Sequence, residues 1–277
     1  MEVLTVEYTS KDAAQRFCQS LKETGFAVLH NHPISTPFIE QAYQHWKDFF
    51  YSEQKHQYTY QKPSQDGYFP FRTENAKDRA ISDLKEFFHF YPWGKIPSEL
   101  KEISLNIYQQ LHRLSATLLE WIEHTLPQPL AKQLSMPLST MIDNSPNTLL
   151  RILHYPPLDQ AMEEGAVRSA SHEDINLITL LPAATAPGLE VLDRHRNWHA
   201  VSCDPGSIVV NVGDMLQMCT QYYYKSTSHR VVNPKETENR SRFSMPLFLH
   251  PRDEVPLSDG HTALTYRHER LRAIGIY

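Results

Sequence analysis

The chain has 277 residues, a formal net charge of −5 and 21% charged residues. It contains no strongly basic stretch, so we expect no nucleic-acid partner, and its apolar runs are too short to span a bilayer. The Met1–Glu7 segment lacks the basic and apolar regions of a signal peptide. Its three cysteines form no Cys-x-x-Cys pair, which favours reduced thiols in a cytoplasmic protein.

The N-terminal part is predicted to combine helices with a buried strand. Ser10 can cap a helix that runs to about Thr24, where Gly25 ends it. A buried strand follows over residues 26–29. A second helix is predicted to begin at residues 35–37, because a proline there suits the first helical turn.

A long helix is predicted in the middle of the chain. Residues 61–80 contain proline and glycine and are expected to be a loop. The helix starts at residues 97–98, and apolar residues recur at helical spacing from Leu100 to Trp121. Such a helix is typical of a spine that packs beneath a sheet.

From about Thr148 the sequence changes to short β-rich runs separated by turns. Many short strands at this spacing predict a mainly β fold with α, whose core is a double-stranded β-helix, or jelly roll, braced by N-terminal helices. The predicted strands cover residues 149–155, 175–181, 188–192, 198–201, 207–212, 228–232 and 242–249.

We expect one compact unit, because no linker separates its parts. Its four parts are an N-terminal mixed α/β region (1–100), the spine helix and connector (101–147), the jelly-roll core (148–251) and a C-terminal extension (252–277).

One His-x-Asp motif comes just before a predicted strand. By composition roughly two His-x-Asp/Glu pairs are expected by chance, so this motif needs support from its context. Alternate residues of a strand share a face, so His172 and Asp174 are expected to point together into a barrel mouth. His229 lies at the start of another predicted strand; taken by itself, it would be interpreted as a core or helix-end histidine. Two histidines and one carboxylate are the ligand set of a non-heme Fe(II) site with open coordination positions.

An Arg-x-Ser pair follows on the last predicted strand. Arg242 and Ser244 would share one face of that strand. A guanidinium pairs with a carboxylate through two parallel hydrogen bonds, and a hydroxyl adds a third. The pair therefore indicates an organic acid as ligand; the alternative is a surface arginine on an edge strand.

These motifs together closely resemble the Fe(II)/2-oxoglutarate-dependent oxygenases of the isopenicillin N synthase-like group, also described as iron/ascorbate-type oxidoreductases. The resemblance extends from about Val3 to Pro251 and is strongest from Leu149 onward. The sequence departs from the family pattern at Pro33 and Glu173, where Gly and Thr are usual. The segments that carry the resemblance are 25–34, 188–191, 205–217, 224–232 and 242–248.

The resemblance implies an enzyme that oxidises a C–H bond of a small molecule, by default through hydroxylation, and consumes dioxygen. Its cofactors would be Fe(II) and the co-substrate 2-oxoglutarate, which yields succinate and CO2, with ascorbate as a reductant. No catalytic residue beyond the metal ligands is implied. By position, the metal ligands would be His172, Asp174 and His229, and the 2-oxoglutarate contacts would be Arg242, Ser244 and Tyr155.

The sequence does not identify the substrate or the oligomeric state. Arg168, Tyr224 and Phe87 are the candidates for substrate contact. Two alternatives to the 2-oxoglutarate enzyme remain. One is an Fe(II) oxidase that works without 2-oxoglutarate, as isopenicillin N synthase does, and the other is a non-catalytic ligand-binding module on the same fold.

Overall fold

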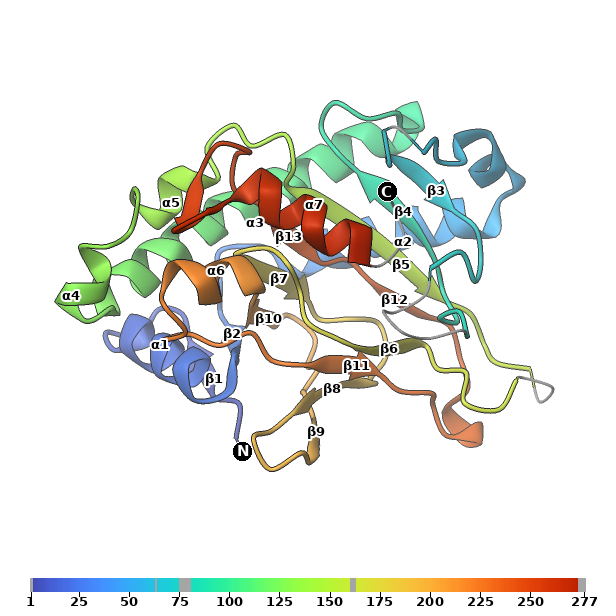
Figure 1. Cartoon of the computed structure of the whole chain (residues 1–277). Coiled ribbons are helices and arrows are strands. Elements are labelled where there is room, and N and C mark those ends of the chain that lie inside the picture. The colour runs from blue at the N-terminus through green and yellow to red at the C-terminus, as the bar shows by residue number, and fades with distance from the viewer. Residues whose placement is uncertain (1, 63, 75–80, 160–162, 274–277) are drawn as a thin grey trace.

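The computed structural model describes every residue except 1, 63, 75–80, 160–162 and 274–277 (Figure 1). In these described residues, no helix has the length and apolar character needed to cross a lipid bilayer. The helices are α1 (Ala13–Thr24), α2 (Thr36–Tyr51), α3 (Ser98–Thr125), α4 (Gln128–Ala131), α5 (Leu138–Met141), α6 (Asp214–Cys219) and α7 (Ala263–Ala273), with 3-10 turns η1 (Glu53–Tyr58) and η2 (Glu236–Glu238).

The larger sheet runs in the order β1-β2-β10-β7-β13-β5-β4-β3, and β12 also pairs with β5. All of its pairs are antiparallel except β1 with β2. Its strands are β1 (Thr5–Glu7), β2 (Phe26–His30), β3 (Gly67–Phe69), β4 (Glu86–Phe90), β5 (Leu149–Tyr155), β7 (Ile178–Pro182), β10 (Ile208–Val212), β12 (Arg242–Ser244) and β13 (Leu247–Leu249).

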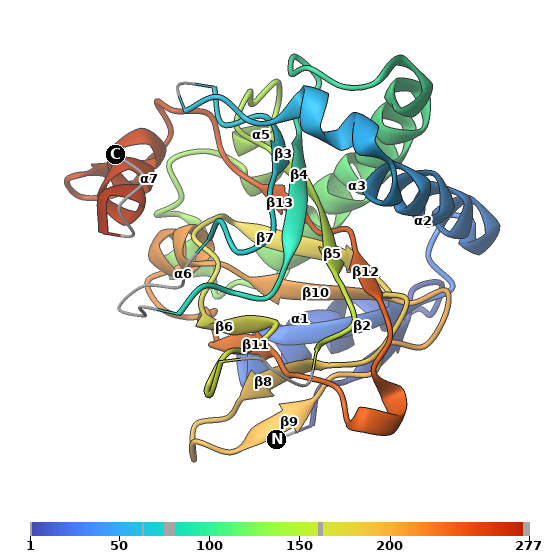
Figure 2. The ribbon, with the colours of Figure 1, turned by 90° about the vertical axis from the view of Figure 1, so that its right-hand side faces the viewer.

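The smaller sheet has the order β6-β11-β8-β9 and lies below the larger one in the view of Figure 2. Two facing antiparallel sheets of this kind make the jelly roll, so the predicted fold class is confirmed. Its strands are β6 (Ser169–His172), β8 (Leu189–Leu192), β9 (Trp198–Ala200) and β11 (His229–Val231); β14 (Pro256–Ser258) and β15 (His261–Thr262) form a separate hairpin.

Strand β5 shows how the larger sheet separates two environments. Successive side chains of a strand point to opposite faces. Leu150 and Ile152 join the main core with the buried face of α3, whereas Leu153 and Tyr155 belong to a smaller apolar cluster with Phe87 of β4. One face of the sheet therefore packs on the helices, and the other lines the space between the sheets.

Gly25 fixes the connection between α1 and β2. Its φ of 77° is left-handed, and a Cβ there would lie 2.2 Å from Oγ1 of Thr227. Only glycine meets both demands without strain. The helix stop predicted from sequence is thus confirmed, and it brings the chain against the segment that precedes His229.

The predicted strand over 26–29 and the starts of α2 and α3 are confirmed, but four predictions were wrong. Ser10 does not cap α1, because the helix begins at Ala13 and its N-cap residue is Asp12, which makes no side-chain cap hydrogen bond. The segment predicted as a loop contains β3, which forms because β4 supplies a pairing partner. The strand predicted over 242–249 divides into β12 and β13 around Pro246, which cannot donate a ladder hydrogen bond. The strand predicted from residue 175 begins only at Ile178, so Asp174 lies in a connection after β6 and not on one strand with His172.

Candidate metal and co-substrate site

Two histidines meet across the smaller sheet. His172 ends β6, His229 begins β11, and the two residues are directly paired in the sheet register. Nδ1 of His172 lies 2.8 Å from the carbonyl of Ala170, and Nδ1 of His229 lies 3.1 Å from the carbonyl of Thr227. Since a carbonyl only accepts, each Nδ1 carries the proton and each Nε2 keeps a free lone pair. Both rings are thus set in the tautomer that a metal ligand needs.

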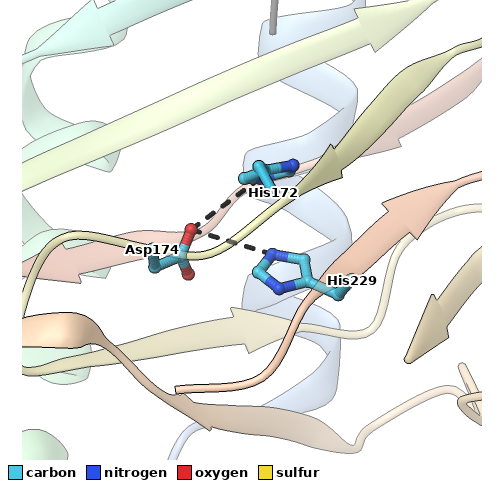
Figure 3. Close-up of side chains that lie close together, drawn as sticks. All are labelled: His172, Asp174 and His229. Atoms are coloured by element: carbon cyan, nitrogen blue, oxygen red, sulfur yellow. Dashed lines mark ion pairs between the residues drawn. The ribbon is translucent and has the colours of Figure 1, made fainter. Parts of the chain in front are cut away.

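The carboxylate of Asp174 faces both of these rings (Figure 3). Its Oδ1 is 3.8 Å from Nε2 of His172 and 3.7 Å from Nε2 of His229. These separations are too long for hydrogen bonds, so the three atoms do not satisfy one another. The potential ligand atoms of the three residues all lie within 4.8 Å of one another, which is a spacing that can hold one metal ion.

The other oxygen of Asp174 is held by the larger sheet. Oδ2 accepts hydrogen bonds from Oγ1 of Thr179 at 2.6 Å and from Nδ2 of Asn211 at 2.8 Å. Thr179 and Asn211 are paired neighbours on β7 and β10. Because Oδ2 is occupied, Oδ1 is the oxygen that faces the imidazoles.

The charges in this cluster suit a cation. Burial raises the pKa of Asp174, but the two imidazoles and the two hydrogen bonds outweigh it and lower that pKa overall. Desolvation, and next the neighbouring His229, lower the pKa of His172. The cluster therefore offers an anionic oxygen from Asp174 and the Nε2 atoms of the two imidazoles. The side chain of His172 is 41% exposed, so the cluster is open on that side.

Arg242, Ser244 and Tyr155 form a second group between the sheets. Arg242 is paired with Tyr155 in the β12–β5 register, and its Cζ lies 5.1 Å from the centre of the tyrosine ring. Its Nε donates to the carbonyl of Ala186 at 3.0 Å, while its buried Nη1 has no partner. Ser244 lies two residues further along the strand and is also buried. A buried guanidinium with an unused donor is a fitting site for a carboxylate.

The three candidates for substrate contact are placed differently. Phe87 lies in the apolar cluster that contains Tyr155, so it lines the same space. Arg168 lies directly before β6 and is 1% exposed. Tyr224 packs in the main core, where its hydroxyl is 3.0 Å from Oγ1 of Thr125 on α3. Tyr224 therefore lies in the core and not beside the metal ligands.

Sequence reasoning missed the residues that support the ligands. Asn211 lies in β10, within the strand predicted over residues 207–212, and its side-chain amide donates to Asp174. Asp83 was not considered; its Oδ1 accepts the backbone N–H of Ala170 at 3.0 Å, and its Oδ2 is 2.9 Å from Nζ of Lys85. For Asn211 there was a signal, because it has an inward-facing position in an apolar strand. For Asp83 there was none.

Arg151 of β5 was also missed. Its guanidinium lies over the ring of Phe87, 4.7 Å from its centre, and 5.6 Å from the centre of the Phe248 ring. Its Nε donates to Nε2 of His89 at 2.9 Å, and its Nη2 lies 3.3 Å from Glu74. The lining of the site thus carries fixed charge as well as aromatic rings.

The geometry defines a mononuclear metal site with two histidines and one carboxylate, inside a jelly roll. Comparison with known proteins agrees with this assignment of the metal site and the fold. The family model of the 2OG-Fe(II) oxygenase superfamily matches residues 146–251, and a model named non-haem dioxygenase in morphine synthesis N-terminal matches residues 3–110.

Individual relatives are similar to this chain over nearly its whole length. Proline hydroxylase buaE from Petromyces alliaceus is 30% identical over 92% of this chain and 89% of that protein. Jasmonate-induced oxygenase 1 from Arabidopsis thaliana is 28% identical over 90% of this chain, which spans 62% of that relative's length. A crystal structure of a candidate oxygenase from Shewanella oneidensis is 47% identical and superimposes with a TM-score of 0.91 over 100% of both chains. The chain belongs to the 2OG-Fe(II) oxygenase superfamily.

Proposed function

We propose that this protein is an Fe(II)- and 2-oxoglutarate-dependent dioxygenase that hydroxylates a C–H bond of a small molecule. In the balanced reaction, substrate, 2-oxoglutarate and O2 give hydroxylated substrate, succinate and CO2. The observation that carries the proposal is the position of Asp174: Oδ2 is held by Thr179 and Asn211, and Oδ1 faces both imidazoles.

In this proposal His172, Asp174 and His229 hold the iron. The bound iron and co-substrate supply the activation of dioxygen. The chain's own residues orient the reactants: the carbonyls of Ala170 and Thr227 fix the ring nitrogens, and the larger sheet fixes the carboxylate. Three protein ligands leave coordination positions for other molecules.

Arg242, Ser244 and Tyr155 would hold the distal carboxylate of 2-oxoglutarate. The unpartnered Nη1 of Arg242 supports this role, because a buried donor without an acceptor costs free energy that a carboxylate would recover. Phe87 would form part of the apolar wall beside the substrate. Because such a wall excludes water, it prevents side reactions.

The cell compartment is also proposed. Cys18, Cys203 and Cys219 are free thiols, which supports a reducing compartment such as the cytoplasm. In such a setting ascorbate would be a suitable reductant that keeps iron ferrous.

The test is consumption of 2-oxoglutarate with release of succinate by the Fe(II)-loaded protein, supplied with O2, ascorbate and a library of small molecules. His172→Ala is expected to lose metal binding and turnover. His199→Ala is the matched control, because His199 also contacts a carboxylate, that of Asp193 at 2.8 Å, but in the β8–β9 hairpin. Metal binding without any 2-oxoglutarate turnover would favour the Fe(II) oxidase alternative. Failure of the wild-type protein to bind Fe(II) would favour a non-catalytic ligand-binding module.

A further inference from the structure

A second arginine is buried next to the group formed by Arg242 and Tyr155. Nη2 of Arg168 donates to the carbonyl of Arg240 at 2.6 Å and lies 3.4 Å from the carbonyl of Pro156. These carbonyls belong to the chain just before Arg242 and just after Tyr155. The guanidinium of Arg168 is thus anchored where β12 and β5 bring those two residues together.

No acidic side chain in the described part of the chain neutralises the two arginines. Among the residues that the structure describes, neither Arg168 nor Arg242 forms an ion pair. Burial, and next the charge of Arg242, lower the pKa of Arg168 to about 10, while Tyr155 opposes this. Two buried cations that repel each other are costly unless an anion binds between them.

Each guanidinium also has an unused donor. Nε of Arg168 and Nη1 of Arg242 are buried, and neither has a hydrogen-bond partner among the residues that the structure describes. A carboxylate has two oxygens with about four acceptor positions, so it can accept from two guanidinium groups at once. An anion that fits this position would present its carboxylate to both unused donors.

Building on the proposed function, we propose that Arg168 binds the distal carboxylate of 2-oxoglutarate together with Arg242. The two guanidinium groups are then oriented by different backbone carbonyls. Arg242 is oriented by the carbonyl of Ala186, and Arg168 is oriented by the carbonyls of Arg240 and Pro156. The second positive charge would make the site select for a dicarboxylate over a 2-oxo acid with a neutral tail.

A purely structural role for Arg168 makes a different prediction. If Arg168 only linked backbone carbonyls through hydrogen bonds, its loss would lower the stability of the protein. It would not change the relative affinities for two 2-oxo acids. Arg252 offers a matched control, because its Nη1 also donates to backbone carbonyls, those of Thr140 at 2.5 Å and Asp143 at 3.0 Å. Those contacts lie outside the site.

The experiment measures binding without turnover. The full chain is loaded with Mn(II) in place of Fe(II), and calorimetry gives the affinities for 2-oxoglutarate and for 2-oxobutanoate, which lacks the distal carboxylate. Arg168→Gln is expected to lower the affinity for 2-oxoglutarate by about 10- to 100-fold and to change that for 2-oxobutanoate by less than about threefold. Arg252→Gln should leave both affinities unchanged. Arg168→Lys retains the charge and is expected to recover part of the preference, and it serves as the test if Arg168→Gln does not fold.

The outcomes separate this inference from the proposed function. If the wild-type protein with Mn(II) binds no 2-oxoglutarate, the proposed function fails, and the role of Arg168 fails with it. If the wild type binds 2-oxoglutarate and the Arg168 variants keep its preference over 2-oxobutanoate, only the inference is overturned. Equal loss of affinity for both acids would also overturn it, because that result fits a structural role.

Discussion

Thr179 and Asn211 lie directly opposite each other on β7 and β10, and both donate a hydrogen bond to the same oxygen of Asp174. This pair in the larger sheet faces the pair His172 and His229 in the smaller sheet. Asp174, in the connection between β6 and β7, joins the two pairs. The ligand set is therefore held by the register of both sheets.

Replacement of Asn211 by alanine should weaken metal binding. Without its amide, Oδ2 of Asp174 keeps only the hydrogen bond from Thr179, so the carboxylate is less firmly oriented. Loss of a partner behind a ligand typically lowers metal affinity by about 10- to 100-fold. Titration of the apoprotein with Mn(II) measures this change. Asn197→Ala, in the β8–β9 hairpin, is the control, and an unchanged affinity in Asn211→Ala would contradict the role given to Asn211.

Arg242→Ala should separate co-substrate binding from metal binding. It removes a charge-assisted contact of about 1.5–3 kcal/mol, which corresponds to an increase of roughly 10- to 100-fold in the KM for 2-oxoglutarate. The metal ligands come from β6, from the connection after it and from β11, so the stoichiometry of bound iron should not change. Steady-state kinetics and metal analysis test both parts. Loss of the iron along with the co-substrate would show that Arg242 supports the fold of the site.

Asp83→Asn should weaken metal binding by His172 through the backbone of Ala170. Asp83 binds the backbone N–H of Ala170, and the carbonyl of Ala170 accepts from Nδ1 of His172. The substitution also leaves Lys85 with Glu74 as its remaining acidic partner, at 2.7 Å. We expect a loss of about 1–3 kcal/mol in the free energy of unfolding and a modestly weaker affinity for metal.

Asp193→Asn is the matched control for Asp83→Asn. Asp193 also binds backbone N–H groups, those of His195 and Asn197, but in the β8–β9 hairpin. It should lower stability without a change in metal affinity. Equal metal affinities in the two variants would argue against a connection between Asp83 and His172.

His89 should make the protein less stable in acid. Its Nδ1 lies 2.8 Å from the carbonyl of Gln65 and its Nε2 accepts from Nε of Arg151, so the folded ring is neutral. Burial, and next the charge of Arg151, lower its pKa from 6.5 to about 3. Between these values the unfolded chain binds the proton and the folded chain does not, so stability is lost as the pH falls below about 6.5.

The size of the effect is at most about 1.4 kcal/mol per pH unit for one proton. His89→Gln keeps a donor and an acceptor but does not titrate, so its free energy of unfolding should fall less steeply between pH 7 and pH 5. Urea unfolding at a series of pH values measures both slopes. His124→Gln, at an exposed position, is the control. Parallel curves for the wild type and His89→Gln would rule out this role for His89.

The sequence alone determined the strand-rich core, the spine helix and the three candidate metal ligands. Periodicity is a local property, so α3 and β5 could be predicted closely. The motifs His172-x-Asp174 and Arg242-x-Ser244 could be recognised because each is short and their order along the chain is distinctive. Local pattern failed at β3, which depends on β4, and just after Asp174, where the strand predicted from residue 175 begins only at Ile178.

Only the tertiary structure decided which residues support these groups. Asn211 lies 37 positions along the chain from Asp174, and Asp83 lies 87 positions from Ala170. Arg168 meets the carbonyl of Arg240 over a separation of 72 positions. Such contacts arise from the pairing of strands and from the folding of one sheet over the other. No local pattern records them, because the free energy that fixes them comes from burial and hydrogen bonding between distant segments.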